Sequence, residues 1–238
     1  MLRDAWALAI ETLSWIELQR LGERLALAKA TKQLAVQDPK AVGLAHKLVF
    51  ETQRRLNVID SIIALVLSPR SLSDYKLGLQ SFLRLYTYNV FFESADFEKA
   101  AAMAGMGRSI LGWRQLIDVE EALGRILSVR LNDVLEGVTD EERVALQTYS
   151  LTWFVKYCFK MLGRSQSLGF LESASLPTPT YVRLNTLKTS EETCLQKLKE
   201  EGVILDKEPL LKHAYKVIEA KKPLMRTQSF REGLFYVQ

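Results

Sequence analysis

The feature that most constrains this chain is a change in the spacing of its apolar residues about three quarters of the way along. Over the first 170 residues they recur every three or four positions, as in Trp6, Ile10, Leu13 and Ile16, which is the period of an amphipathic helix. In TYVRLNTL, residues 180–187, apolar and polar residues alternate instead, as they do in a strand. The sequence therefore predicts a mostly α protein, a helical bundle of about seven helices, followed by a small α+β domain.

Capping signals place some of the helix boundaries. Asp38-Pro39 is an N-cap followed by proline at the first helical position, and the helix it opens is expected to run to Ser68-Pro69. One apolar stripe supports that single long helix: Leu44, Leu48, Thr52, Leu56, Ile59, Ile63 and Val66.

Other boundaries follow from capping boxes and glycines. Capping-box spacing appears at Asp118 with Glu121, at Thr139 with Glu142 and at Thr189 with Glu192. Ser150 opens the segment LTWFVKYCFKML, and Gly163 closes it.

The domain boundary is expected at the proline-rich stretch LPTPT, residues 176–180. We predict an all-α domain over residues 1–172 and a small α+β domain over residues 173–238. In the second domain TYVRLNTL, VIL, YKVIE and GLFYVQ are the predicted strands, and EETCLQKLKEEG is the predicted helix. Gly202 and Gly233 fit turns between them.

Composition narrows the class of protein. No apolar run is long enough to cross a bilayer, and Asp4 and Glu11 interrupt the first apolar stretch, so neither a membrane span nor a signal peptide is expected. The two cysteines form no CxxC pair, which favours a cytoplasmic protein without disulfides. Net charge is −1 over residues 1–150 and +5 over residues 151–238, a distribution that favours a polyanionic partner near the C-terminal end.

Residues of the kind that catalyse reactions or bind metals are scarce. The two histidines, His46 and His213, share no motif with a cysteine, serine or aspartate, so we expect no catalytic triad and no metal site. Cys158 and Cys194 lie among apolar residues, where a packing role is expected. Gly105-Met-Gly107 follows a helical segment rather than a strand, so it lacks the context of a phosphate-binding loop. We predict no catalytic and no cofactor-binding residue in this chain.

Three polar residues stand out in the first predicted strand. Alternation places Arg183 and Asn185 on one face, opposite Val182 and Leu184, and Lys188 follows at the end of the strand. A guanidinium can grip a phosphate with two hydrogen bonds, and an asparagine amide can read a base edge or a 2′-hydroxyl. We therefore predict RNA contact by these three residues. The competing interpretation is that Arg183 and Asn185 brace the small domain against another domain.

Two further basic clusters are candidates for RNA contact. Lys156, Lys160 and Arg164 are spaced four residues apart, as along one helix face, and Lys221, Lys222 and Arg226 lie near the C-terminus. If the two domains dock, these residues would line a groove that follows an RNA backbone. The competing interpretation is that each cluster is an ordinary solvated surface.

The segment TYVRLNTLKTSEETCLQKLKEEGV resembles the R-x-N-x-L-K region upstream of the catalytic domain in Sun/Fmu-type RNA 5-methylcytosine methyltransferases. REGLFYVQ, residues 231–238, is similar to the segment that leads into their cofactor-binding domain, except that the chain stops before the aspartate. KLVFETQRRLNVIDSIIALVL and YKLGLQSFLRLYTYNVFF resemble the NusB-like helical domain of the bacterial members.

The resemblance implies that the parent protein uses S-adenosylmethionine and two cysteines of a downstream domain to methylate cytosine. Cys158 and Cys194 match neither of those cysteines. The chain would then be the RNA-recognising N-terminal portion, its partners being RNA, rRNA more than tRNA, and its own downstream methyltransferase domain. Two alternatives remain. One is a stand-alone NusB-like RNA-binding or ribosome-assembly factor without catalytic activity, and the other is a helical scaffold that binds proteins.

Overall fold

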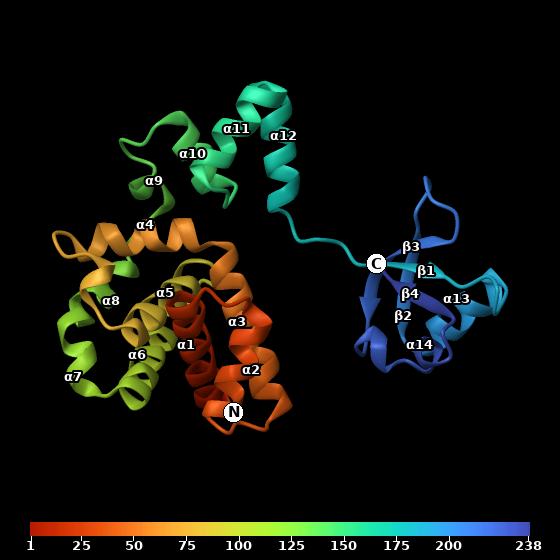
Figure 1. Ribbon diagram of the computed structural model, residues 1–238, viewed down its shortest axis with the longest axis horizontal. Coiled ribbons are helices and arrows are strands. Elements are labelled where there is room, and N and C mark those ends of the chain that lie inside the picture. The colour runs from red at the N-terminus through yellow and green to blue at the C-terminus, as the bar shows by residue number, and fades with distance from the viewer. The chain divides into compact units, whose positions relative to one another are not determined.

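The computed structural model describes residues 1–238 and divides into two compact units, Met1–Ser175 and Leu176–Gln238 (Figure 1). The first is entirely helical, and the second combines a four-stranded sheet with short helices. This confirms the predicted fold class, a helical bundle followed by a small α+β part. The unit boundary lies at residues 175/176, because the last helix of the first unit continues past the division at 172/173 that the sequence suggested.

The helical unit contains α-helices joined by short turns and two 3-10 segments. Their bounds, in chain order, are α1 Leu2–Gln19, α2 Glu23–Gln33, α3 Pro39–Arg54, α4 Leu56–Leu67, η1 Leu72–Asp74, α5 Leu77–Phe91, α6 Phe97–Leu111, α7 Trp113–Leu116, η2 Ile117–Val119, α8 Glu120–Ile126, α9 Leu131–Val134, α10 Asp140–Gln147, α11 Thr152–Leu162 and α12 Arg164–Ser175.

The main core of this unit is centred on α5. Phe82 is fully buried, and its ring lies 6.1 Å from Trp6 of α1 and 6.0 Å from Tyr86 one turn along α5. Helices α1, α3, α4 and α6 pack around α5, and α8 completes the cluster. Burial of aromatic rings of this size is the main source of stability for a bundle of short helices.

The predicted helix over residues 39–67 is two helices, and the prediction of one continuous helix is wrong. Asp38 caps α3 as expected, its side chain accepting a hydrogen bond from Lys40 N, but the helix ends at Arg54. Arg55 leaves the helical region, with φ −114° and ψ 17°. Its guanidinium pairs with Glu51 and lies 5.1–5.7 Å from the rings of Tyr88, Phe92 and Tyr149. A periodic stripe continues across the break, so periodicity could not reveal it.

The other boundary predictions gave mixed results. Thr139 forms its capping box with Glu142, and Gly163 ends α11 with φ 75°. Asp118 caps nothing, because α8 begins at Glu120 after Val119, and α11 follows Leu151 rather than Ser150. A second, smaller core holds α10–α12 together around Val144, Val155, Cys158 and Leu171.

Gly107 of α6 has a packing role that its sequence motif did not suggest. A Cβ atom at this position would lie 2.5 Å from two ring atoms of the buried Phe82 and 3.1 Å from Leu116. Gly105, two residues earlier in the same helix, has nothing within 4 Å of its Cβ position. The lack of a side chain therefore permits close packing of the Phe82 ring at Gly107 but serves no packing role at Gly105, which makes Gly105 a control for Gly107.

Gly107→Ala is expected to destabilise the helical unit by about 1–3 kcal/mol, because the added methyl displaces a ring packed on all sides. Gly105→Ala is expected to stabilise it by about 0.5–1 kcal/mol through helix propensity. Urea unfolding followed by tryptophan fluorescence measures both, since Trp6, Trp15, Trp113 and Trp153 all lie in this unit. Equal effects of the two substitutions would show that Phe82 does not constrain position 107.

The small unit is an antiparallel sheet with strand order β2-β3-β1-β4 (Figure 1). After a linker without regular structure at residues 176–180, as predicted, its elements are β1 Tyr181–Leu184, α13 Glu191–Glu200, β2 Val203–Lys207, β3 Ala214–Ala220, η3 Leu224–Arg226, α14 Gln228–Arg231 and β4 Phe235–Val237. The predicted strands are confirmed, except that the first ends at Leu184 and residues 186–188 form a turn. The turn glycines are confirmed as well, Gly202 with φ 78° and Gly233 with φ 69°. Helix α13 begins at Glu191, where the predicted segment EETCLQKLKEEG begins, but its cap is Ser190 rather than Thr189.

One face of the sheet carries the core of the small unit. Val182, Leu184, Tyr215 and Phe235 are buried there against Cys194 and Leu198 of α13. Phe230 of α14 adds an edge contact to Phe235, with ring centroids 5.7 Å apart. Both cysteines of the chain are buried. None of the helices in either unit combines the length and apolar character that a bilayer span requires.

Candidate nucleic-acid interface

The opposite face of the sheet is formed by the other set of alternating residues. In the strand register Arg183 pairs with Ala214 of β3 and with Tyr236 of β4, so these three residues form one row across the sheet. Glu208, the residue after β2, continues the row, because its backbone N–H donates to the Ala214 carbonyl. Asp206, Lys216, Tyr181 and Gln238 form the neighbouring row. We call these eight residues the open face, since the helices of the unit pack on the other side: Tyr181, Arg183, Asp206, Glu208, Ala214, Lys216, Tyr236 and Gln238.

Arg183 lies in the half of the open face formed by β1 and β4. Its side chain is exposed and makes no ion pair and no hydrogen bond. Tyr236, directly opposite Arg183 on β4, is 56% exposed, and Tyr181 is two residues away on β1. This half of the face carries no carboxylate, since Asp206 and Glu208 both belong to the β2 side. An unpaired guanidinium on the same face as two tyrosines can bind a phosphate while the rings offer stacking surfaces.

Asn185 and Lys188 have structural partners within the small unit. The Asn185 amide donates to the Gly233 carbonyl at 2.9 Å and lies 3.5 Å from the Tyr236 hydroxyl, while its oxygen accepts from Leu187 N. Lys188 Nζ donates to the Glu232 carbonyl at 2.8 Å. Both residues therefore hold the turn before β4 in place, and Asn185 helps to orient Tyr236. Their direct contact with RNA stays a prediction.

The cluster predicted on one face of α11 is divided between two helices. Lys156 and Lys160 are exposed on α11. Arg164 lies after the Gly163 turn, as the first residue of α12, and forms a bidentate ion pair with Asp140 while its guanidinium lies 5.4 Å from the Phe159 ring. The prediction of one helix face for all three residues is wrong, because the helix ends at Leu162.

The third predicted cluster follows β3. Lys221 packs its aliphatic chain over Gly202, and Lys222 lies 3.8 Å from Glu201. Arg226 is exposed at the end of η3. Contact of these residues with RNA, and a groove shared with α11, stay predictions.

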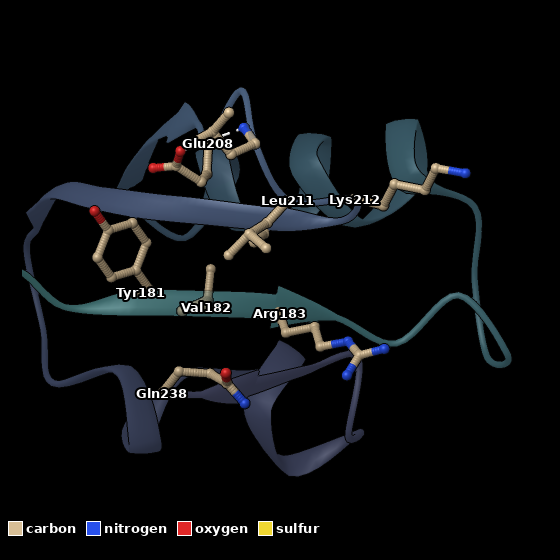
Figure 2. A pocket seen from close by; sticks show the side chains of 9 residues that line it. Tyr181, Val182, Arg183, Glu208, Leu211, Lys212 and Gln238 are labelled. Carbon is tan, nitrogen blue, oxygen red and sulfur yellow. Dashed lines mark hydrogen bonds between the residues drawn. The ribbon is translucent and has the colours of Figure 1, made fainter.

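A pocket of about 690 Å³ opens beside Arg183, between β1 and the loop that joins β2 to β3 (Figure 2). Figure 2 shows Tyr181 and Leu211 between β1 and β3, with the Arg183 and Lys212 side chains extending toward the same end. The lining is completed by Val182, Glu208, Leu210, Ala214 and Gln238.

Sequence reasoning missed Tyr236, Lys212 and Glu208. Alternation in GLFYVQ does place Tyr236 on the other face of the strand from the buried Phe235, so the exposure of Tyr236 could have been predicted from the sequence. The pairing of β4 with β1, and the position of the β2–β3 loop beside β1, depend on contacts between residues more than 20 positions apart. No local pattern encodes those contacts.

A hydrogen-bonded cluster fixes the β2–β3 hairpin to α13. The Glu191 carboxylate, in the first turn of α13, accepts hydrogen bonds from the Tyr215 hydroxyl, from His213 Nδ1 at 2.7 Å and from Lys207 Nζ at 3.3 Å. These hydrogen bonds lower the pKa of Glu191 from 4.5 to about 2, and the bond from Tyr215 has the largest effect. Burial and the bond to Glu191 raise the pKa of Tyr215 to about 12.

The stability of the small unit should therefore depend on the ionisation of Glu191. Because the pKa of Glu191 is lower in the folded state, its contribution is complete above about pH 4.5 and is lost as the pH falls toward about 2. We expect Glu191→Gln to flatten the pH dependence of unfolding in this window, measured from the Tyr215 and Val217 amide signals by NMR. Glu192→Gln, at an exposed position without a hydrogen-bond partner, is the control and should leave the profile unchanged. An unchanged profile in Glu191→Gln would contradict the assignment.

The structure contains no group of three or more His, Cys, Asp or Glu side chains arranged to hold a metal ion. His213 is the neighbour of Glu191 described above, and His46 is exposed on α3.

No protein-family model and no curated protein matches the chain. Among solved structures, that of PH0851 is similar to this chain along its whole length. The match covers 100% of this chain and 53% of the PH0851 chain, with 16% identity and a TM-score of 0.62. A methyltransferase homologue from Pyrococcus horikoshii matches 42% of this chain and 33% of its own, at 22% identity and a TM-score of 0.37. A chain from the structure of the antitermination factors NusB and NusE in complex with double-stranded RNA also matches. The match covers 53% of this chain and 95% of that chain, at 18% identity and a TM-score of 0.46.

The similarity to PH0851 shows that both units of this chain occur together in a known fold. The chain spans about half the length of PH0851. The other two TM-scores are below 0.5, so the fold similarity rests on PH0851.

Proposed function

We propose that this chain binds single-stranded RNA through the open face of its small unit, as the substrate-recognition portion of an RNA cytosine-5 methyltransferase. The observation that carries the proposal is the exposed, unpaired guanidinium of Arg183 on the same face as Tyr181 and Tyr236. Arginine beside aromatic rings on an uncovered sheet suits a flexible strand, because the cation holds a phosphate while the rings stack on bases whatever their identity.

The methyltransferase part of the proposal comes from the sequence. Arg183, Asn185 and Lys188 belong to the segment that resembles the R-x-N-x-L-K region of the Sun/Fmu-type enzymes, in which rRNA would be preferred over tRNA as substrate. The catalytic chemistry and S-adenosylmethionine would belong to a domain outside these 238 residues. This chain covers 53% of PH0851, so that protein has residues beyond the part that matches.

The test is the salt dependence of binding to a single-stranded RNA of ten nucleotides by the full chain. Each phosphate contact with a single strand contributes about 0.7 to the slope of log affinity against log salt. We expect Arg183→Ala to weaken binding and to reduce the slope by about 0.7. Arg231→Ala is the matched control, because Arg231 is an exposed arginine on α14 without an ion pair.

Absence of RNA binding, or equal effects of the two substitutions, would contradict the proposed function. Unfolding of Arg183→Ala in circular dichroism would instead support a bracing role for Arg183. Reading the gene beyond codon 238 tests the enzyme assignment, which fails if no cofactor motif and no cysteine pair follow.

A further inference from the structure

The pocket beside Arg183 has the size and lining of a site for one small organic group. Its volume of about 690 Å³ falls within the range of small-molecule sites. Tyr181, Leu210 and Leu211 supply an apolar wall, and Leu211 is 59% exposed although it lies against the strand (Figure 2). Exposed leucines beside a tyrosine ring leave a surface that a flat apolar group would cover.

Charge at the two ends of the pocket is asymmetric. Arg183 and Lys212 extend toward one end in Figure 2, and neither makes an ion pair or a side-chain hydrogen bond. Glu208 lies toward the other end of the view. Its carboxylate has no cation within reach, and its one hydrogen bond, from Leu210 N, is long at 3.4 Å. The pocket therefore offers two free cations, an apolar wall and a free acceptor, in that order.

We propose that this pocket holds a single nucleotide of the bound RNA and selects a base that carries an amine at the position of cytosine N4 or adenine N6. The proposal rests on the RNA-binding function proposed above and adds base selection to it. The phosphate lies between Arg183 and Lys212, and the base lies against Tyr181 and Leu211. The Glu208 carboxylate accepts a hydrogen bond from the amine of cytosine or adenine. The O4 carbonyl of uracil is itself an acceptor, so it would repel the carboxylate instead.

Ten-nucleotide oligo(C), oligo(A) and oligo(U) bound to the full chain provide the test. Cytosine and uracil differ at position 4 by an amine against a carbonyl, so their comparison isolates the acceptor. We expect oligo(C) and oligo(A) to bind about tenfold more tightly than oligo(U), the effect of one charge-assisted hydrogen bond. Glu208→Gln should bring the three affinities together, because an amide can donate as well as accept.

Two loop substitutions test the rest of the pocket. Leu211→Ala and Lys212→Ala, both at exposed positions of the loop, should each weaken oligo(C) binding about fivefold or more. Lys199→Ala on α13 is the control, since Lys199 is exposed and does not line the pocket. If RNA binds and Arg183→Ala weakens it, but the pocket variants and the choice of base have no effect, the pocket assignment is wrong and the RNA-binding function stands. If no oligonucleotide binds, both are wrong.

Discussion

Replacing Tyr181 and Tyr236 together by alanine is expected to weaken the binding of single-stranded RNA by roughly 30- to 25,000-fold. The two residues lie on the same face of the sheet as Arg183, Tyr181 two residues before it on β1 and Tyr236 opposite it on β4, and a base stacked on each ring contributes about 1–3 kcal/mol. Fluorescence anisotropy of a labelled ten-nucleotide RNA with the full chain measures the loss.

Phenylalanine at the same two positions is the matched variant. It keeps the stacking surface and removes only the hydroxyls, so affinity should stay within about threefold of the wild type. Tyr215 makes no contribution of this kind, because it is buried on the opposite face and bonded to Glu191. Equal losses in the alanine and phenylalanine variants would show that the hydroxyls, not the rings, carry the binding.

Arg84→Met is expected to destabilise the helical unit by about 2–4 kcal/mol, because it removes the cation of Asp60 and the nearer of the two cations of Glu17. Arg84 is 8% exposed on α5. Its Nε and Nη2 donate to the two carboxylate oxygens of Asp60 at 2.8 and 2.9 Å, and Nη1 lies 3.4 Å from Glu17. The guanidinium thus joins α1, α4 and α5 through one side chain.

Urea unfolding followed by tryptophan fluorescence measures this effect. Arg24→Met is the control, since Arg24 is exposed on α2 without an ion pair, and it should change stability by less than about 0.5 kcal/mol. A small effect of Arg84→Met would show that water replaces the guanidinium at Asp60 and Glu17, both of which are about one third exposed.

The fold was largely predictable because local patterns encode it. Helical spacing of the apolar residues ends at the proline-rich linker, and period-two spacing begins after it. The division into a helical bundle and a small mixed unit can therefore be predicted from residues close together in the sequence. The break at Arg55 was not predictable in this way. It is maintained by Glu51 and by three rings: one from α5, one from the residue that follows α5 and one from the turn after α10. These contacts form only in the folded chain.

The candidate site was predictable only in part, for the same reason. Alternation in VRLN correctly placed Arg183 opposite Val182 and Leu184, which are buried. It could not show that the Asn185 amide is bonded to Gly233, or that Lys188 reaches the Glu232 carbonyl, because both partners lie more than 40 residues away. Residue type indicates what a side chain can do, and the sheet pairing decides which of those possibilities is used.

The most direct test of RNA binding by the open face is a map of backbone amide shifts in the full chain as a ten-nucleotide single-stranded RNA is added. We expect the largest changes at Tyr181, Arg183 and Tyr236, and little change along α13, which covers the other side of the sheet. Changes confined to α13, or none in the small unit while the RNA is bound, would contradict binding at the open face.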